Sequence, residues 1–354
     1  MIRVSRRATE WMAGLVAIST LAAMAPGCRA QSLTGAGATF PYPIYSKWFD
    51  VYHQKTGVTI NYQSIGSGAG IQQVKAGTVD FGASDAALSD DKLRDMPRPV
   101  IHFPTVGGAV VLAYNLPDLK GRLQLTPDVV TGIFMGKIPT WNDKRIASIN
   151  PGVELPGSPI LPVHRSDGSG TTNIFTMYLS SVSSEWKNTI GYNTAVSWPA
   201  GVGGKGNEGV AGLVRQQPGS VGYVELAYAK QNKLPYALLK NKAGNFVDPT
   251  LASVTEAIEG ASDRLAKDVR TPIVNSAKGG AYPICGLTYL LVYRDSKDTA
   301  KAKALAEFIQ WAIHDGQDMA ESLDYAKLPA AVVKVDDANL MKLTSNGKPL
   351  LASR

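Results

Sequence analysis

The densest group of residues that could do chemistry runs from Arg165 to Thr172, with the sequence RSDGSGTT. It places a guanidinium, a carboxylate and several hydroxyls on a glycine-rich turn, directly before a helical stretch at 173–179. The start of a helix leaves backbone N–H groups unpaired and carries a partial positive charge. Ser169, Gly170 and Thr171 can therefore offer N–H and hydroxyl donors to an anion. The segment predicts an oxyanion site.

Arg165 supplies the positive charge of this predicted site. Its forked guanidinium can form charge-assisted bonds to two oxygens of one anion. Asp167 stands two residues further along the chain, where its carboxylate can pair with the guanidinium and fix its direction. We expect Asp167 to orient Arg165 and not to contact the anion itself.

Two earlier segments repeat the pattern of a small hydroxyl residue at a predicted helix start. They are Thr39-Phe40 and Ser67-Gly68. Thr39 is expected to cap the helix that follows it. A Ser or Thr before a helix is usually only a cap. The hypothesis of one shared anion site depends on all three segments together.

Asp85 ends the short strand predicted at 79–85, a position where an Asp is most often a turn or cap residue. A carboxylate beside an oxyanion repels it unless the ligand carries a proton to donate. Phosphate carries such a proton near neutral pH and sulfate does not. If Asp85 faces the site, it favours phosphate.

Short strands alternate with helices along the chain, which predicts an α/β fold with mixed, mostly parallel sheets flanked by helices. Two longer apolar strands, 106–114 and 285–293, are candidates for crossings between two domains. The last amphipathic segment, 299–315, predicts a long helix. The other expected elements are strands at 32–38 and 58–63 and helices at 44–52, 71–74 and 88–96.

The composition is that of a folded protein, with 44% hydrophobic and 18% charged residues over 354 residues, a length that favours two domains. Residues 1–30 begin with arginines and continue into a weakly polar run too short to span a membrane, which predicts a signal peptide. Its removal takes away four basic and one acidic residue and lowers the net charge from +7 to +4. Without a Lys/Arg block, this charge predicts no nucleic-acid partner.

The two cysteines and four histidines do not form a metal or disulfide pattern. Cys28 leaves two outcomes open, a lipid anchor on its thiol or ordinary cleavage near Ala30. Cys285 is expected to be a buried thiol. The stretch 203–206 lacks the nucleotide-loop pattern and is interpreted as a turn between elements. We therefore expect no cofactor and no metal.

Five blocks of the sequence carry a resemblance to a known family. They are SLTGAGATFP at 32–41, GSG at 66–68, TVDFGASD at 78–85, DGSGT at 167–171 and GSVGYVELAYAK at 219–230. In content and order they resemble periplasmic phosphate-binding proteins, the substrate receptors of phosphate-specific ABC transporters. The resemblance extends over nearly the whole mature chain. Local departures are His164 before Arg165, and Cys285 in the second crossing strand.

The resemblance implies a two-lobed, type II periplasmic-binding-protein fold whose lobes close over the ligand. Lobe I would comprise 31–106 and 285–354, and lobe II 107–284. The implied phosphate contacts are Thr39, Phe40 through its backbone N–H, Ser67, Asp85, Arg165, Ser169, Gly170 and Thr171, with Asp167 paired to Arg165. The protein would be a periplasmic monomer that delivers phosphate to permease subunits and, through them, depends on an ATPase subunit.

Three alternatives stay open at this point. A phosphate-ester hydrolase would need a nucleophile with a base, or a metal cluster, and neither is evident in the sequence. A receptor for a sulfate-type oxyanion would use similar donors. An extracellular adhesion or scaffold protein with the same fold would be expected to lack a ligand residue, yet none is missing.

Overall fold

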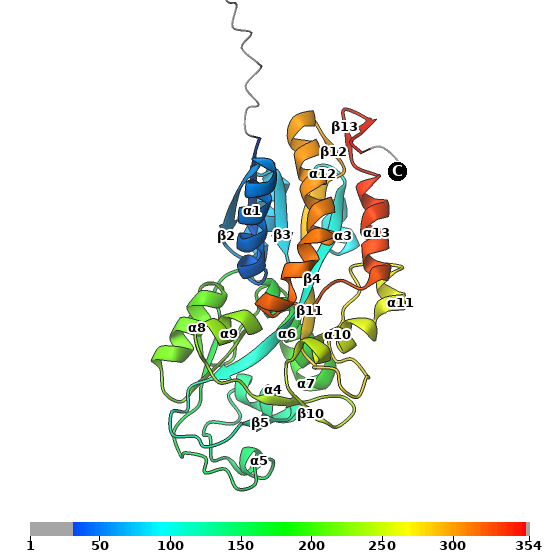
Figure 1. Ribbon diagram of the computed structural model, residues 1–354. Coiled ribbons are helices and arrows are strands. Elements are labelled where there is room, and N and C mark those ends of the chain that lie inside the picture. The colour runs from blue at the N-terminus through cyan, green and yellow to red at the C-terminus, as the bar shows by residue number, and fades with distance from the viewer. Residues whose placement is uncertain (1–30, 352–354) are drawn as a thin grey trace, which may run out of the picture. The chain divides into compact units, whose positions relative to one another are not determined.

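The computed structural model describes residues 31–351, so the expected signal peptide at 1–30 and the choice at Cys28 lie outside the described residues. One mixed sheet of eight strands, in the order β2-β1-β3-β11-β4-β8-β6-β7, forms its centre (Figure 1). These strands are β1 (Ser32–Gly37), β2 (Thr59–Ser64), β3 (Phe81–Ser84), β4 (Val100–Tyr114), β6 (Leu161–Arg165), β7 (Val202–Gly204), β8 (Ser220–Glu225) and β11 (Cys285–Tyr293).

Two three-stranded sheets complete the strands of the described part. One has the order β10-β9-β5 and the other β12-β13-β14. Their bounds are β5 (Gln124–Leu125), β9 (Leu238–Lys240), β10 (Phe246–Val247), β12 (Asp295–Ser296), β13 (Thr344–Ser345) and β14 (Lys348–Pro349).

The direction of the strands changes at the centre of the large sheet. The outer strands pair in parallel, β1 with β2 and β3, and β6 with β7 and β8. The two long strands β4 and β11 instead run antiparallel to each other and to their neighbours β3 and β8. All nine residues of β11 are buried. The predicted α/β fold with a mixed sheet is confirmed.

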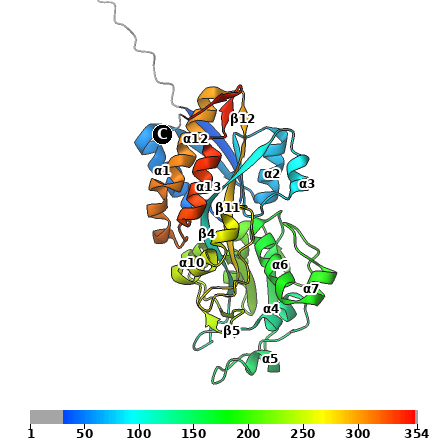
Figure 2. The same ribbon diagram turned by 90° about the vertical axis from the view of Figure 1, so that its right-hand side faces the viewer.

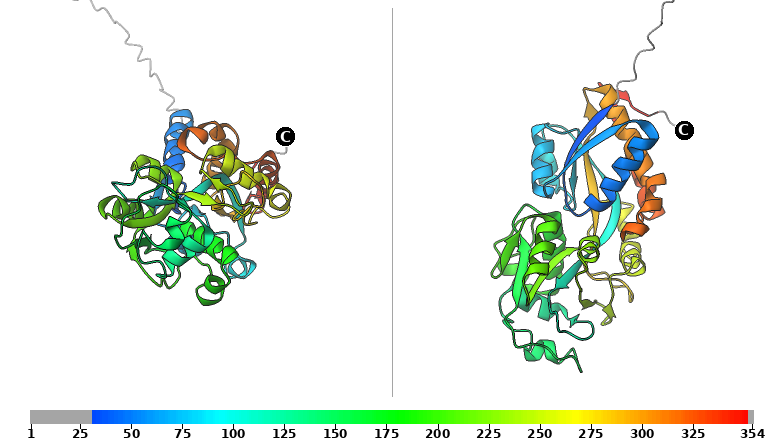
Figure 3. Two further views of the ribbon diagram at one scale, coloured as in Figure 1. Left: turned by 90° about the horizontal axis from the view of Figure 1, so that it is seen from below. Right: turned by 60° about the vertical axis from the view of Figure 1, so that its left-hand side comes forward.

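Helices cover both faces of the sheet. Figure 2 shows α1 and α12 on one side of the first strands and α2 on the other, while in Figure 3 α8 lies against the strands at the opposite end, where it contacts β6, β7 and β8. The helices are α1 (Tyr42–Thr56), α2 (Ser67–Ala76), α3 (Asp90–Arg94), α4 (Pro127–Phe134), α5 (Lys144–Ala147), α6 (Gly170–Val182), α7 (Ser184–Thr189), α8 (Gly206–Gln216), α9 (Leu226–Gln231), α10 (Leu251–Glu259), α11 (Ser262–Leu265), α12 (Thr299–Ile313) and α13 (Ala330–Leu340), with 3₁₀ helices η1 (Asp315–Met319) and η2 (Glu321–Leu323).

The hydrophobic pattern explains how α12 packs. Its residues Leu305, Phe308, Ile309, Ala312 and Ile313 are all buried, as their helical spacing predicts. Their side chains join the aromatic core beneath α1. The expected C-terminal helix is confirmed, and it ends two residues before the predicted limit.

The turns that follow parallel strands place the polar residues. Strands β1, β2 and β3 are parallel, so their carboxyl ends meet at one edge of their part of the sheet. Strands β6 and β7 run in the opposite direction, because β11, β4 and β8 are each antiparallel to the strand before them in the sheet order, and the carboxyl end of β6 points back towards those of β1–β3, where Gly170 N donates to Ser67 Oγ. The helices α1, α2, α6 and α8 begin at these ends. No described helix is long and apolar enough to cross a membrane.

Candidate functional site

The turn between β1 and α1 holds Thr39 and Phe40, both almost completely buried. The expectation that Thr39 caps the helix is wrong, because α1 begins only at Tyr42 and has Pro41 at its N-cap position. The Thr39 hydroxyl is used elsewhere: its oxygen accepts from the backbone N–H of Asn207 at 3.2 Å and from Asn207 Nδ2 at 2.7 Å. Among residues 31–351, the backbone N–H of Phe40 has no protein acceptor.

Ser67 is the first residue of α2 and is fully buried. Its hydroxyl oxygen accepts two backbone N–H groups, one from Gly170 at 3.0 Å and one from Asp85 at 3.2 Å. A single side chain thus joins the start of α2 to the start of α6 and to the end of β3.

The start of α6 contributes three of the predicted residues. Ser169 is the N-cap, and its hydroxyl oxygen accepts from Thr172 N at 3.0 Å. Gly170 donates its N–H to Ser67. Thr171 accepts at its hydroxyl from Arg165 Nη1 at 3.2 Å and from Asn207 Nδ2 at 3.1 Å.

Arg165 is buried and forms a bidentate pair with the partly buried Asp167. Arg165 Nε donates to Asp167 Oδ1 at 2.8 Å, and Nη2 donates to Oδ2 at 2.6 Å. Burial alone would raise the pKa of Asp167, but the bonds from Arg165, its positive charge and the N–H of Gly206 hold that pKa below its ordinary value. The pair cancels in net charge and leaves further N–H groups of the guanidinium free to donate.

The hydroxyls of the site are set up as donors. A hydroxyl has two acceptor lone pairs and one proton, and the oxygens of Thr39, Ser67 and Thr171 each already accept two N–H groups. What each can still offer is its proton. The cluster therefore presents O–H and N–H donors to a ligand.

Asp85 is the exception among these donors. The residue is 5% exposed, and Oδ1 is buried without a hydrogen-bond partner among the described residues. Burial raises its pKa to about 7, an effect that Thr288, Arg165 and Ser67 partly offset. The site thus combines many donors with one carboxylate acceptor.

Glycines make the close approach possible. A Cβ on Gly170 would lie 2.5 Å from Asp85 Oδ2 and 2.5 Å from Ser67 Oγ, so any larger residue would displace these groups. Gly68 donates its N–H to Gly168 O at 2.8 Å, and a Cβ on Gly68 would lie 3.0 Å from Gly168 Cα. The two glycine-containing turns touch through their backbones.

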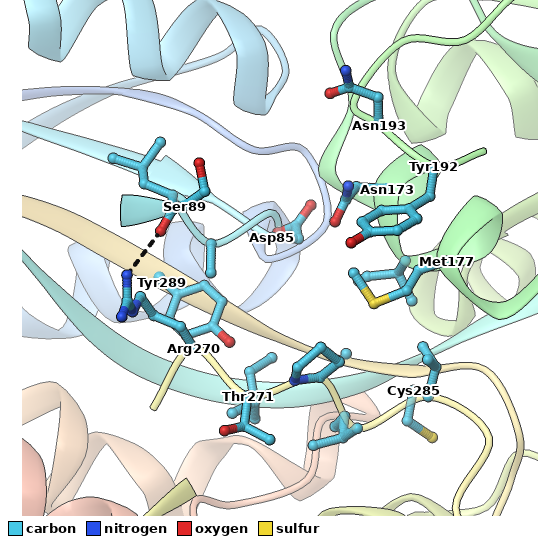
Figure 4. A pocket seen from close by; sticks show the side chains of 18 of the residues that line it. Asp85, Ser89, Asn173, Met177, Tyr192, Asn193, Arg270, Thr271, Cys285 and Tyr289 are labelled. Carbon is cyan, nitrogen blue, oxygen red and sulfur yellow. Dashed lines mark hydrogen bonds between the residues drawn. The ribbon is translucent and has the colours of Figure 1, made fainter. Parts of the chain in front are cut away.

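A pocket of about 560 Å³ opens beside the cluster, and Asp85 is among the side chains that line it (Figure 4). Its one arginine, Arg270, already pairs with Asp268 and Asp90, so its charge is compensated. Cys285 also lines the pocket; it is a free, buried thiol as predicted, and burial raises its pKa. The pocket gives Asp85 a route towards solvent, and its second cation, Lys92, lies on α3 away from the hydrogen-bonded cluster.

The predicted site residues thus gather in one hydrogen-bonded cluster, with Phe40 next to Thr39 in the chain. The sequence reasoning missed Asn207, which is fully buried and bonds to both Thr39 and Thr171. It also interpreted 203–206 as a turn, whereas β7 occupies Val202–Gly204 and α8 begins at Gly206. The sequence signal that could have identified Asn207 is its position at the start of a helix, directly after the glycine-rich run.

The histidines of the described part lie in separate environments. Within 31–351, no group of three or more His, Cys, Asp or Glu side chains could hold a metal ion. His102 is buried and accepts from Leu88 N at 3.0 Å, and burial lowers its pKa to about 4. His164 stacks on Trp198.

The fold and the cluster define a substrate-binding protein, and a family model described as the PBP superfamily domain matches residues 22–315. Two solved structures share the fold. One is a putative phosphate ABC transporter substrate-binding protein with bound phosphate from Clostridium perfringens, with a TM-score of 0.63, 18% identity and coverage of 84% of this chain and all of that chain. The other is a high affinity periplasmic phosphate-binding protein bound with phosphate, with a TM-score of 0.68, 23% identity and coverage of 87% and 93%.

Relatives of higher identity narrow the class. The phosphate-binding protein PstS of Xylella fastidiosa (strain Temecula1) is 47% identical over 321 residues, which are 90% of this chain and 88% of that protein. PstS of Haemophilus influenzae is 46% identical over 309 residues, or 87% and 92%. The chain belongs to the PstS family of phosphate-binding proteins.

Proposed function

We propose that this protein binds inorganic phosphate at the cluster formed by the predicted contact residues and delivers it to an ABC transporter for uptake. The proposed contacts are Thr39, Phe40, Ser67, Asp85, Arg165, Ser169, Gly170 and Thr171, with Asp167 orienting Arg165. The observation that best supports this proposal is the arrangement of hydrogen-bonding groups, in which buried donors are combined with one carboxylate acceptor. That pattern matches a tetrahedral oxyanion that still carries a proton.

The acceptor argues for phosphate over sulfate. Near neutral pH, phosphate can donate its proton to the carboxylate of Asp85, whereas sulfate can only present a bare oxygen to it. The pKa of about 7 places the Asp85 carboxyl close to the range where phosphate itself exchanges a proton. One proton shared between the carboxylate and the ligand gives both groups a hydrogen-bond partner.

We also propose that the site closes between two lobes, 31–106 with 285–354 and 107–284. The crossing strands β4 and β11 are the candidate hinge, because they join the two parallel groups of strands. The bonds of Ser67 to Gly170 and of Thr39 to Asn207 connect one proposed lobe to the other. Opening at the hinge would break them and release the anion.

The cellular setting follows from the same proposal. Residues 1–30 would export the chain to the periplasm, either with cleavage near Ala30 or with a lipid anchor on Cys28. The partners would be transmembrane permease subunits and, through them, an ATPase subunit. The receptor itself would act as a monomer, and it is a binding protein and not an enzyme.

Calorimetric titration of residues 31–354 tests the proposed function. Inorganic phosphate is expected to bind one to one, while glycerol phosphate is excluded because a site that contacts all four oxygens leaves no room for a substituent. Arg165→Ala is the control; losing a buried charge-assisted contact costs about 2 to 5 kcal/mol. If the wild-type protein instead releases phosphate from glycerol phosphate and Arg165→Ala does not, the protein is a hydrolase.

A further inference from the structure

Three tyrosine hydroxyls hold three successive carbonyls of the turn between β1 and α1. Tyr62 donates to Ala38 O at 2.7 Å, Tyr228 donates to Thr39 O at 2.6 Å, and Tyr325 donates to Phe40 O at 2.7 Å. The three donors come from β2, from α9 and from the segment after η2. Distant parts of the chain thus converge on one short stretch of backbone.

The three hydrogen bonds differ in the nitrogen that shares a peptide unit with each carbonyl. The carbonyl of Thr39 shares its peptide unit with the N–H of Phe40, a proposed anion donor. The carbonyl of Phe40 shares its unit with Pro41, which has no N–H. A hydrogen bond to a carbonyl polarises its peptide and strengthens the N–H of that unit as a donor. Tyr228 can therefore act on the ligand through a peptide bond, and Tyr325 cannot.

The environment keeps Tyr228 in the form that donates. The residue is 5% exposed, and burial together with the charges of Glu208 and Glu225 raises its pKa. The phenol consequently stays protonated at physiological pH. Its oxygen lies on α9, more than a hundred residues along the chain from the carbonyl it contacts.

We propose that Tyr228 is a positioning residue of the anion site. Its hydroxyl fixes and polarises the Thr39–Phe40 peptide so that the N–H of Phe40 donates strongly to the bound anion, and it holds α9 against the β1–α1 turn. The inference rests on the proposed function, since it assigns Tyr228 an effect on phosphate held at that site.

The chain offers a matched control for this inference. In Tyr228→Phe, Thr39 O keeps the N–H of Tyr42 at 3.1 Å, so no carbonyl is stranded and the variant is expected to fold. Tyr325→Phe also removes one buried hydroxyl, which bonds in addition to Glu225 Oε2 at 3.2 Å. The control therefore loses at least as many hydrogen bonds, but none of them acts on an N–H of the site.

The test measures the phosphate dissociation constant, the thermal stability without phosphate, and the amide proton shift of Phe40 in the ¹⁵N-labelled complex. Tyr228→Phe is expected to weaken phosphate binding about three- to tenfold, the range that one hydrogen bond supports. The Phe40 amide proton should move upfield. Tyr325→Phe should leave the dissociation constant and the Phe40 shift close to wild type, with a lower melting temperature.

Two outcomes would overturn the inference. One is a Tyr228→Phe variant that binds phosphate as tightly as wild type or keeps the wild-type Phe40 shift. The other is an equal loss of affinity in both variants, which would indicate a purely structural role. A wild-type protein that binds no phosphate would instead overturn the proposed function, and the wild-type titration separates the two failures.

Discussion

Asp85→Asn changes the one acceptor of the site into a group that can also donate. In wild type, a sulfate oxygen would face the buried carboxylate of Asp85, whose Oδ1 has no other described partner. Two acceptors in contact without a proton leave a buried group unsatisfied, at a cost of about 1 to 3 kcal/mol. The amide of the variant can turn its N–H₂ towards sulfate and remove that cost.

The expected result is a narrower selectivity with little change in phosphate affinity. Phosphate exchanges one hydrogen bond to a carboxylate for one to an amide and is relieved of like charge. Sulfate gains a donor, so the phosphate-to-sulfate preference should narrow at least about tenfold, which corresponds to about 1.4 kcal/mol. The change should appear mainly as stronger sulfate binding.

Competition calorimetry with both anions at matched ionic strength measures this selectivity at about pH 8, above the Asp85 pKa of about 7, where the carboxyl is mostly ionised and cannot itself donate a proton to sulfate. Asp167→Asn is the matched control, because it removes the same formal charge but acts on the ion pair with Arg165. It should weaken both anions without narrowing their ratio. The reasoning is refuted if Asp85→Asn excludes sulfate as completely as wild type, or if Asp167→Asn narrows the preference as much.

Two further predictions concern packing and pH. Gly170→Ala would place a Cβ 2.5 Å from both Asp85 Oδ2 and Ser67 Oγ. Overpacking of this kind costs about 1 to 3 kcal/mol, so a titration should show phosphate binding weakened by about fivefold or more. An unchanged dissociation constant would contradict this packing. Burial raises the pKa of Asp85 from 3.8 to about 7, so between these two pH values the folded protein keeps a proton that the unfolded chain loses. The free energy of unfolding without phosphate should therefore fall as the pH rises from 3.8 to about 7, and it should level off above that pH. The total decrease is about 4 kcal/mol at most. Urea unfolding of wild type and Asp85→Asn checks this, and equal pH profiles would argue against the buried carboxyl.

Local patterns in the sequence were enough to predict much of the fold. The burial of Phe308 and its helical neighbours follows from spacing within α12, and the pairing of Arg165 with Asp167 needs only two steps along the chain. The antiparallel direction of β4 and β11 could not be predicted in this way. A continuous apolar run shows that a strand is buried but not which way its neighbours run.

The parts of the site that the sequence did not reveal depend on distant contacts. Asn207 bonds to Thr39 across 168 residues, and this contact also explains why Thr39 is no helix cap. Tyr228 and Tyr325 resemble ordinary core tyrosines until the carbonyls they contact are known. Such pairings are products of the tertiary fold, so no local spacing predicts them.

A crystal structure of residues 31–354 with inorganic phosphate is the most direct test of the proposed anion site. We expect phosphate at the starts of α2 and α6, with oxygens within hydrogen-bond distance of Phe40 N, Ser67 Oγ and Arg165, and one oxygen against the carboxylate of Asp85. Phosphate bound instead in the adjoining pocket beside Arg270, with no contact to Asp85, would contradict it.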